Sequence, residues 1–314
     1  MSYIVEDVSF PSKNGSSTCR GKIYIPEGKE IKGVVQLSHG MVDHVGRYGE
    51  LVSALTDAGY VFAGNDHLGH GMTAKESGDE FGYFGEDGGR YNVVDDLHTM
   101  NALLYERFGM KPCLFGHSMG SFLARLYAVR YPDTISSLVI HGTGGPMGAI
   151  LPLGKGVVKL IMLLCGRTHR SMFVKKLAFA GYNSHYPKEE GSSAWLTRDL
   201  AMVADRSEDE FTSFIFTVSA YLELFRMLGE SNGKKWFSDF PKGLRTLVMS
   251  GDDDPVGAYG KGPEYIHGKL ADAGVSDLSL KLYPGARHEL FNETNRDEVF
   301  SDILAWIERK IPQK

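Results

Sequence analysis

The sequence is poor in cysteine and tryptophan, with three of each among 314 residues, and it carries no excess of basic charge. Its cysteines, Cys19, Cys113 and Cys165, are odd in number, far apart and without a C-x-x-C pair. This pattern argues against a disulfide framework and favours a reducing compartment. Cys113 and Cys165 fall in an expected strand and an apolar helix, so we expect both thiols to be buried. Lysine and arginine number 34 against 39 acidic residues, a formal net charge of −5, so we expect no nucleic-acid partner.

Long hydrophobic runs are missing as well. The longest that we find, Leu160 to Cys165, is far shorter than the roughly 20 residues that a membrane span needs. The opening residues, Met1 to Val8, have neither the basic segment nor the continuous apolar stretch of a secretory signal. We therefore expect a cytoplasmic protein whose contact with membranes is transient and limited to their surface. The sequence leaves the oligomeric state open.

Short apolar runs alternate with amphipathic stretches along most of the chain. Strands are predicted at 34–38, 60–64, 112–115, 137–140, 245–250 and 278–283. Helices are predicted at 48–58, 91–108, 119–131, 264–273 and 298–309. This alternation indicates an α/β fold with a mostly parallel sheet and crossover helices on both faces. Segments 3–10 and 19–25, with Asn14-Gly15 between them, predict an antiparallel hairpin at the sheet edge.

The alternation stops between residues 144 and 232, where the pattern is helical and rich in leucine, isoleucine and methionine. A long insertion between two strands is typical of a lid, although an extra helical layer that buries only its own core is the alternative. We expect a core domain of residues 1–143 and 233–314 and a helical cap of residues 144–232. Residues 147–173 carry more apolar surface than packing alone requires, so we expect part of it to line an acyl tunnel, with the cap touching membrane surfaces.

A candidate nucleophile lies in the segment Gly116 to Gly120 (GHSMG), which follows a predicted strand and opens a predicted helix. In that context a G-x-S-x-G match marks a sharp turn that projects the serine hydroxyl, and the glycines let neighbouring backbone pass. The helix dipole also points toward developing negative charge. We expect Ser118 to be the nucleophile.

A serine hydroxyl needs a base to remove its proton, and that base needs an acid to hold its tautomer. In this architecture they follow in the order serine, acid, histidine, each after a later strand. His288 lies in the loop after strand 278–283 and is the expected base. Asp252, Asp253 and Asp254 follow strand 245–250, and the residues alone leave the choice among these acids open.

An oxyanion needs two backbone donors. One is expected from Met119, the residue after the nucleophile, and the other from the loop His39-Gly40-Met41 that follows strand 34–38. We expect the Met41 amide to be the second donor.

Three segments together resemble the monoacylglycerol lipase and lysophospholipase branch of the α/β-hydrolase fold: Ser38 to Tyr48 (SHGMVDHVGRY), Asn65 to Gly71 (NDHLGHG) and GHSMG. Tyr182-Asn183, Trp195 to Asp199 and Tyr283 to Glu289 look like that branch too. The resemblance implies a capped serine hydrolase with Ser118, Asp254 and His288 as triad and with Met41 and Met119 as oxyanion donors. It implies a small lipophilic ester substrate, such as a monoacylglycerol or lysophospholipid, and an acyl-enzyme intermediate.

The segment Ala204 to Glu208 departs from this resemblance, because it lacks an Asp-Pro pair expected there. The substrate is therefore the least determined feature. A prolyl-aminopeptidase-like enzyme with the same triad is an alternative, with Glu189, Glu190 or Asp199 binding the free amine. A non-catalytic binding protein on the same fold is a third interpretation, although such proteins usually lack a triad member, and none is missing here.

Two further clusters allow two interpretations each. His44, Arg47 and Tyr48 either shape the acyl site or bond to the loop at a helix start. Asp66, His67 and His70 suggest a metal site, but they also fit a strand-end turn, and no Cys or Glu cluster accompanies them. We expect neither a metal nor a cofactor.

Overall fold

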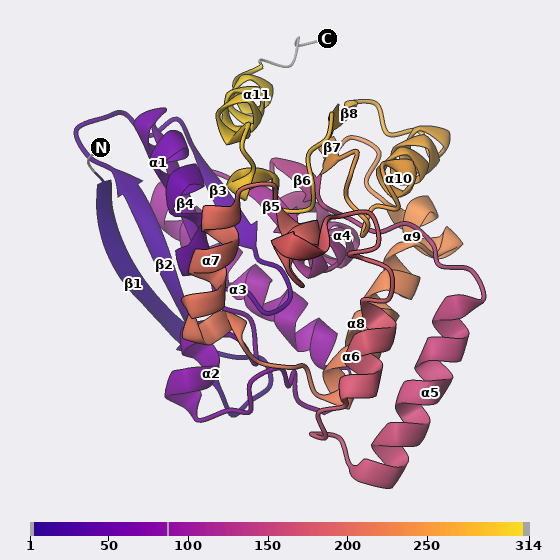
Figure 1. Cartoon of the computed structure of the whole chain (residues 1–314). Coiled ribbons are helices and arrows are strands. Elements are labelled where there is room, and N and C mark those ends of the chain that lie inside the picture. Colours follow the sequence, from indigo (N-terminus) through magenta and orange to yellow (C-terminus); the bar gives the residue numbers. More distant parts are fainter. Residues whose placement is uncertain (1–2, 87, 310–314) are drawn as a thin grey trace.

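A computed structural model describes residues 3–86 and 88–309, and within them eight strands form one sheet in the order β1-β2-β4-β3-β5-β6-β7-β8 (Figure 1). The strands are β1 (Tyr3–Pro11), β2 (Thr18–Pro26), β3 (Gly33–Ser38), β4 (Tyr60–Asn65), β5 (Cys113–His117), β6 (Ser137–His141), β7 (Arg245–Gly251) and β8 (Leu278–Tyr283). β2 pairs antiparallel with β1 and with β4, and the remaining neighbours pair parallel. The predicted α/β fold with an antiparallel edge hairpin is confirmed.

Helices of the core cover both faces of this sheet. They are α1 (Gly49–Asp57), α2 (Gly71–Ser77), α3 (Gly89–Phe108), α4 (Met119–Arg130), α9 (Lys234–Asp239), α10 (Lys261–Asp272) and α11 (Arg296–Glu308). α1 and α11 pack on one face, where Phe115 and Val139 point, and α4 and α10 pack on the other, where Leu114 and Leu138 point. This alternation of neighbouring residues is the period of two that a strand buried on both faces requires. α2 and α9 are the core helices that the periodicity did not predict.

Four further helices lie between β6 and α9. They are α5 (Ile150–Cys165), α6 (Met172–Ala178), α7 (Leu200–Glu208) and α8 (Val218–Ser231). Three of them begin at a polar residue whose side chain accepts a backbone N–H of the first turn: Ser171 before α6, Asp199 before α7 and Thr217 before α8. Short 3₁₀ helices occupy Val45–Tyr48, Pro132–Thr134, Lys188–Glu190, Ala194–Leu196, Glu210–Thr212 and Leu290–Asn292.

α5 packs on α8 and lies at the lower right of Figure 1, away from the sheet. Val158 is its one fully buried side chain, whereas Leu163 is 82% exposed. The expectation that Cys165 is buried is wrong, because this residue ends α5 and is exposed. α5 carries leucines on both its inner and its outer side, and its lysines do not mark the outer side, because Lys155 is half-buried. None of the helices among the described residues is long and apolar enough to span a membrane.

Candidate active site

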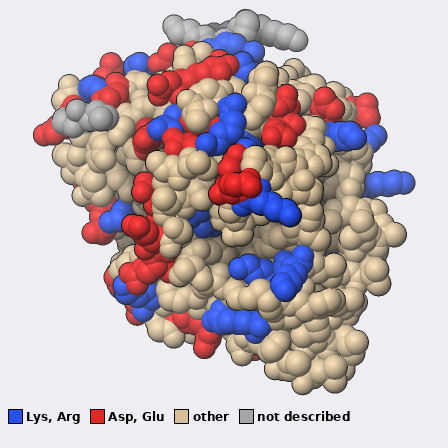
Figure 2. Space-filling view, viewed as in Figure 1, with Lys and Arg blue, Asp and Glu red and all other residues tan. Residues whose placement is uncertain are grey.

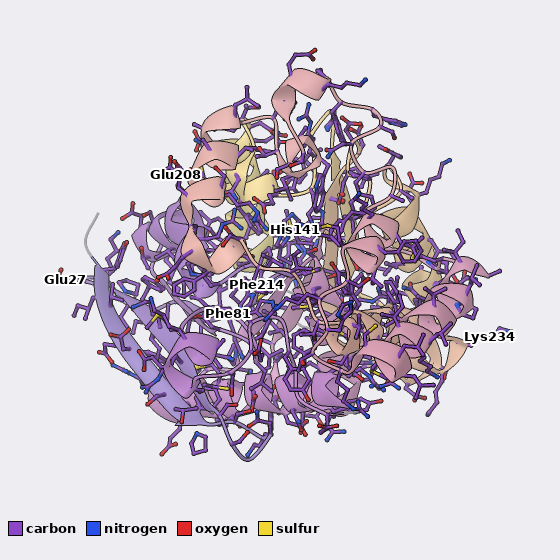
Figure 3. The ribbon with its side chains drawn as sticks, turned by 60° about the horizontal axis from the view of Figure 1, so that its bottom comes forward. Glu27, Phe81, His141, Glu208, Phe214 and Lys234 are labelled. Carbon is purple, nitrogen blue, oxygen red and sulfur yellow. The ribbon has the colours of Figure 1, made fainter. Side chains whose placement is uncertain are left out.

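The sequence-predicted site residues gather at the carboxyl edge of the parallel strands. Ser118 directly follows β5, Asp254 lies three residues beyond β7, and His288 lies five residues beyond β8. Because these strands run parallel, their carboxyl ends meet at one edge of the sheet, where α/β folds place their sites. Figure 3 shows His141, the last residue of β6, near the middle of the molecule.

Ser118 occupies a strained turn between β5 and α4. Its φ is +53° and its ψ is −120°, a conformation that residues with a Cβ rarely adopt. Its amide donates to the His141 carbonyl at 3.0 Å. A Cβ on Gly116 would lie 2.6 Å from the Gly120 carbonyl oxygen, and one on Gly120 would lie 1.9 Å from that of Ser38. Both glycines are therefore required by close backbone approach.

His288 and Asp254 form a buried pair. The His288 Nδ1 to Asp254 Oδ2 distance is 2.9 Å, and the two side chains are 2% and 0% exposed. Asp254 also accepts the Val256 amide at 2.8 Å through Oδ1. Because a carboxylate only accepts, Nδ1 of His288 carries the proton and Nε2 is left as the basic nitrogen. The His288 ring lies 5.0 Å from the ring of His117, the neighbour of Ser118.

The other two aspartates have different partners. Asp252 is exposed, and its Oδ1 accepts the Gly285 amide at 2.6 Å. Asp253 is half-buried, and its backbone carbonyl accepts the Tyr186 hydroxyl at 2.5 Å. Burial raises the pKa of Asp253. Of the three adjacent carboxylates, the structure brings Asp254 to the histidine.

His39 sets the direction of one peptide in the loop after β3. Its Nε2 accepts the His67 amide at 2.9 Å, so the proton resides on Nδ1. Nδ1 lies 2.9 Å from the Gly40 carbonyl oxygen and donates to it. Since the N–H of a trans peptide points opposite to its C=O, the Met41 amide points away from His39. Burial lowers the pKa of His39, which keeps this imidazole neutral.

The amides on either side of Met41 are engaged. Gly40 N donates to Asp43 Oδ2 at 3.2 Å, and Val42 N donates to His70 Nε2 at 3.3 Å. Within residues 3–86 and 88–309, the amides of Met41 and Met119 donate to no protein group. A Cβ on Gly40 would lie 3.4 Å from that of Ser118, so this loop touches the candidate nucleophile. An oxyanion hole requires two free N–H groups of this kind, and the role of Met41 and Met119 as its donors stays a prediction.

A buried charge cluster supports this loop. Asp43 accepts the Tyr48 hydroxyl at 2.6 Å and the Arg47 guanidinium at 2.9 Å. Arg47 also pairs with Glu289, the neighbour of His288, at 3.1 Å. Although burial alone raises it, the guanidiniums of Arg47 and Arg206 lower the pKa of Glu289 to about 2. Arg47 and Tyr48 thus bond to the loop, the second interpretation left open by the sequence.

The histidines after β4 act as hydrogen-bonding groups of a turn. Asp66 accepts the Val45 amide at 2.9 Å and the Met72 amide at 2.8 Å. His67 Nε2 lies 3.1 Å from the Ser38 hydroxyl, and burial lowers the pKa of His70 to about 3. In the described part of the chain, no three His, Cys, Asp or Glu side chains lie together as metal ligands would.

Three residues at this edge were not predicted as site residues. His141 lies 2.9 Å from His117 between their Nδ1 atoms. Trp195, from the insertion, places its ring 5.0 Å from that of His288. Arg206 on α7 donates to the Val42 carbonyl at 3.0 Å. No local pattern marks the last contact, because its partners are 164 residues apart in the chain.

Known proteins with similar sequences include ester hydrolases. Residues 29–295 match the family described as serine aminopeptidase, S33. A monoacylglycerol lipase of Mycolicibacterium smegmatis is 27% identical over 287 residues, 88% of each chain. A monoglyceride lipase of Saccharomyces cerevisiae is 27% identical over 299 residues, which cover 89% of this chain and 86% of the yeast protein.

Solved structures give the same result. The crystal structure of a thermostable carboxyl esterase from Bacillus coagulans, in complex with glycerol, superposes with a TM-score of 0.89 at 30% identity. That match covers 96% of this chain and 97% of the esterase. With its elbow serine, its sheet and its family match over most of its length, the chain belongs to the serine aminopeptidase, S33 family of α/β-hydrolases.

Proposed function

We propose that this protein is a serine hydrolase that cleaves carboxylic esters of lipophilic acyl chains, monoacylglycerols among them. The observation that carries the proposal is the 2.9 Å contact between His288 Nδ1 and Asp254 Oδ2, at the sheet edge where Ser118 occupies its strained turn. The esterase and lipases to which the chain is similar support an ester as the substrate.

In the proposed reaction, Nε2 of His288 accepts the Ser118 Oγ proton as Oγ attacks the ester carbonyl carbon. The negative charge that develops on the carbonyl oxygen accepts hydrogen bonds from the Met41 and Met119 amides. His288 then returns the proton to the leaving alcohol, which leaves an acyl group on Ser118. Water, activated by the same imidazole, releases the acid. Asp254 holds the tautomer that the two proton transfers require.

An apolar wall beside the oxyanion donors supports a lipophilic acyl group. Met41 is half-buried against the same hydrophobic cluster that contains Met119. Half-buried side chains of the insertion join this cluster, among them Leu151, Ile161, Phe179 and Phe214. Figure 3 shows Phe214 next to Phe81, with 5.3 Å between the ring centroids. Each methylene buried against such a wall contributes about 0.8 kcal/mol.

The geometry favours this function over an aminopeptidase. Such an enzyme needs a carboxylate for the substrate amine, and two of the three candidates already have cationic partners. Glu190 accepts Arg287 at 2.6 Å, and Asp199 accepts Arg296 at 2.8 Å while it caps α7. Glu189 is exposed. A carboxylate already paired with arginine gives little extra attraction to an ammonium group.

The test is a p-nitrophenyl ester series from acetate to octanoate, with aminoacyl p-nitroanilides measured beside it. We expect kcat/KM to rise with acyl length and monoacylglycerol to be cleaved faster than triacylglycerol. Ser118→Ala should lower kcat by about 10⁴-fold or more and abolish fluorophosphonate labelling. Ser53→Ala, whose hydroxyl bonds only to its own helix, is the control. A fluorophosphonate adduct on another residue, or amides cleaved better than every ester, contradicts the proposal.

We also infer that residues 144–232 act as the cap and that its outer face docks on anionic membrane surfaces. Large apolar side chains of α5 and α6 are exposed there: Ile150, Leu153, Leu160, Leu163, Leu164, Met172 and Phe173. Between residues 144 and 187 the chain has six lysines and arginines and no acidic residue, although its net charge is −5. Figure 2 shows this lower right area as broad and largely uncharged, with Lys and Arg along its border. Exposed apolar groups bordered by basic ones suit an anionic lipid surface.

We also propose that the protein is cytoplasmic. This location is supported by the three cysteines, which are free thiols, because a reducing compartment keeps thiols from forming disulfides.

A further inference from the structure

Arg206 of α7 reaches from the insertion into the loop that carries a candidate oxyanion donor. Its guanidinium donates to the Val42 carbonyl at 3.0 Å, and its Nε lies 3.8 Å from Glu289 Oε1. The side chain is only 16% exposed. One side chain therefore contacts both the loop with Met41 and the neighbour of His288. It lies in the segment Ala204 to Glu208, where the sequence departs from the pattern of the lipases it resembles.

Val42 has a backbone conformation that it would not adopt unaided. Its φ is +53°, in the left-handed region that β-branched residues avoid. Both of its backbone polar groups are held: the amide donates to His70 Nε2 at 3.3 Å, and the carbonyl accepts Arg206. Strained residues persist where their surroundings over-determine them, and here one of the two restraints comes from the insertion.

α7 has a second attachment to the same loop. His44 Nε2 lies 2.7 Å from Asp209 Oδ2, just beyond the end of α7. The helix is thus seated on the segment from Val42 to His44 at two points. Met41, the candidate oxyanion donor, directly precedes this segment.

We propose that Arg206 is a positioning residue for ester hydrolysis: it holds Val42 in its strained conformation and so aims the Met41 amide at the oxyanion. The oxyanion hole is then complete only while α7 is seated on the loop. This role rests on the proposed hydrolase function, and it predicts a loss in transition-state stabilisation rather than in substrate binding. It also predicts that removing the strain at Val42 makes Arg206 partly dispensable, because glycine adopts a positive φ without cost.

The experiment measures kcat and KM for p-nitrophenyl butyrate, and melting temperature, in five proteins. These are the wild type, Arg206→Gln, Arg206→Lys, the double variant Val42→Gly with Arg206→Gln, and Lys75→Gln. We expect Arg206→Gln to lower kcat by about 10- to 100-fold with KM within about twofold, the size of effect that a misplaced oxyanion donor produces. The double variant should recover at least about fivefold of that loss. Arg206→Lys should lie between the wild type and Arg206→Gln, since it keeps the charge without the planar fork.

Lys75→Gln is the matched control. It breaks another ion pair between the core and the insertion, Lys75 with Glu210 at 2.7 Å, without touching the loop. It should leave kcat unchanged. If Arg206→Gln does not fold, Arg206→Lys with and without Val42→Gly gives the same comparison.

Two results overturn the role of Arg206: an unchanged kcat in the folded Arg206 variant, or no recovery of kcat when Val42→Gly is added. A merely structural Arg206 would lower the melting temperature without recovery of kcat in the double variant. If the wild type itself hydrolyses no ester, the proposed function fails instead, so the two failures are distinguishable.

Discussion

Apart from residues 213–232, which include α8, the insertion consists of two arms with opposite character. We call residues 144–180, with α5 and α6, the outer arm, and residues 181–212, with α7, the inner arm. In Figure 1 the arms are separated, with α7 at the left and α5 and α6 at the lower right. The outer arm is apolar and basic on its exposed side, whereas the inner arm is polar and contacts the loops of the candidate site.

Hydrogen bonds of the inner arm fix the loops that carry Asp254 and His288, the proposed acid and base. Tyr186 donates to the Asp253 carbonyl, next to Asp254. The amide of His288 donates to the Trp195 carbonyl at 3.4 Å, and the amide of Glu289 donates to the Leu196 carbonyl at 2.7 Å. The inner arm therefore contacts the candidate site directly, as the sheet does.

The ion pairs of the outer arm are made with a segment outside the candidate site. Arg170 pairs with Glu80 at 2.7 Å and Arg167 with Glu86 at 3.2 Å, both in the segment between α2 and α3. These pairs are substantially exposed, so each contributes little to stability. The difference teaches that one insertion can make two kinds of contact: the inner arm bonds to the loops of the candidate site, and the outer arm leaves a large apolar face exposed.

The largest effect on kcat is expected at Asp254, the proposed acid, whose loop the inner arm contacts. Asp254→Asn should lower kcat by about 10⁴-fold, because an amide supports the wrong imidazole tautomer. Asp252→Asn and Asp253→Asn are matched controls in the same loop and should retain most of the activity. Steady-state kinetics with a p-nitrophenyl ester checks this order. A larger loss for either control would mean that the acid is misassigned.

This prediction also marks what the sequence is able to specify. Ser118 and His288 are recognisable because each lies in a short segment with a defined place after a strand. The choice of Asp254 depends on how a loop turns, and Asp252 and Asp253 have the same chemistry one and two residues away. Spacing along the chain does not encode that turn.

The fold shows the same division between local and distant signals. Every predicted strand is present, because apolar runs bounded by turns are local patterns. The exposed face of α5 and the contact of Arg206 with Val42 depend on tertiary packing, and the lysines of α5 do not mark its outer side. The contacts of the two arms are therefore visible only in the structure and could not be predicted from local sequence patterns.

A second prediction tests the unequal attachment of the arms. Glu293 is fully buried and joins the His288 loop to the inner arm, accepting Arg198 Nε at 2.7 Å and the Arg287 amide at 2.8 Å. Glu293→Ala leaves these donors unpaired and should lower the free energy of unfolding by about 3 kcal/mol. Glu86→Gln, which breaks an exposed pair of the outer arm, should cost less than about 1 kcal/mol. Urea denaturation measures both, and equal losses would contradict the division.

A third prediction concerns pH and the buried histidines beneath the inner arm. Burial is the main cause that lowers the pKa of His117 to about 4, from an unfolded value near 6.5. As the pH falls, the unfolded chain therefore binds a proton at His117 before the folded protein does. The contribution of neutral His117 to the free energy of unfolding is complete above pH 6.5 and is lost as the pH falls toward 4. The loss amounts to about 3 kcal/mol. Glu289, with a pKa of about 2, loses its contribution only at lower pH.

Urea denaturation between pH 7.5 and 4 checks this dependence. His117→Gln should make the decline smaller by about 3 kcal/mol, and the remainder comes from His39 and His70, whose pKa values burial also lowers. His169→Gln, which changes an exposed histidine of the outer arm, should leave the decline as in the wild type. An equal decline in His117→Gln and the wild type would contradict a lowered pKa of His117 in the folded protein.

The smallest effect on stability is expected on the outer face of α5. Leu163 and Leu164 are 82% and 74% exposed, so the double Ser variant should change the free energy of unfolding by less than about 0.5 kcal/mol. Val158→Ala, on the buried side of the same helix, should cost about 2 kcal/mol.

Binding to phosphatidylserine vesicles should nonetheless fall about tenfold in the Ser variant, because two leucines no longer enter the lipid. Binding to phosphatidylcholine vesicles should be weaker in both proteins, since the basic border then has no anionic partner. Hydrolysis of a short soluble ester should be unaffected, because these side chains face away from the core. If the Ser variant sediments with anionic vesicles as the wild type does, the outer arm is not the docking face, and its exposed leucines need another partner.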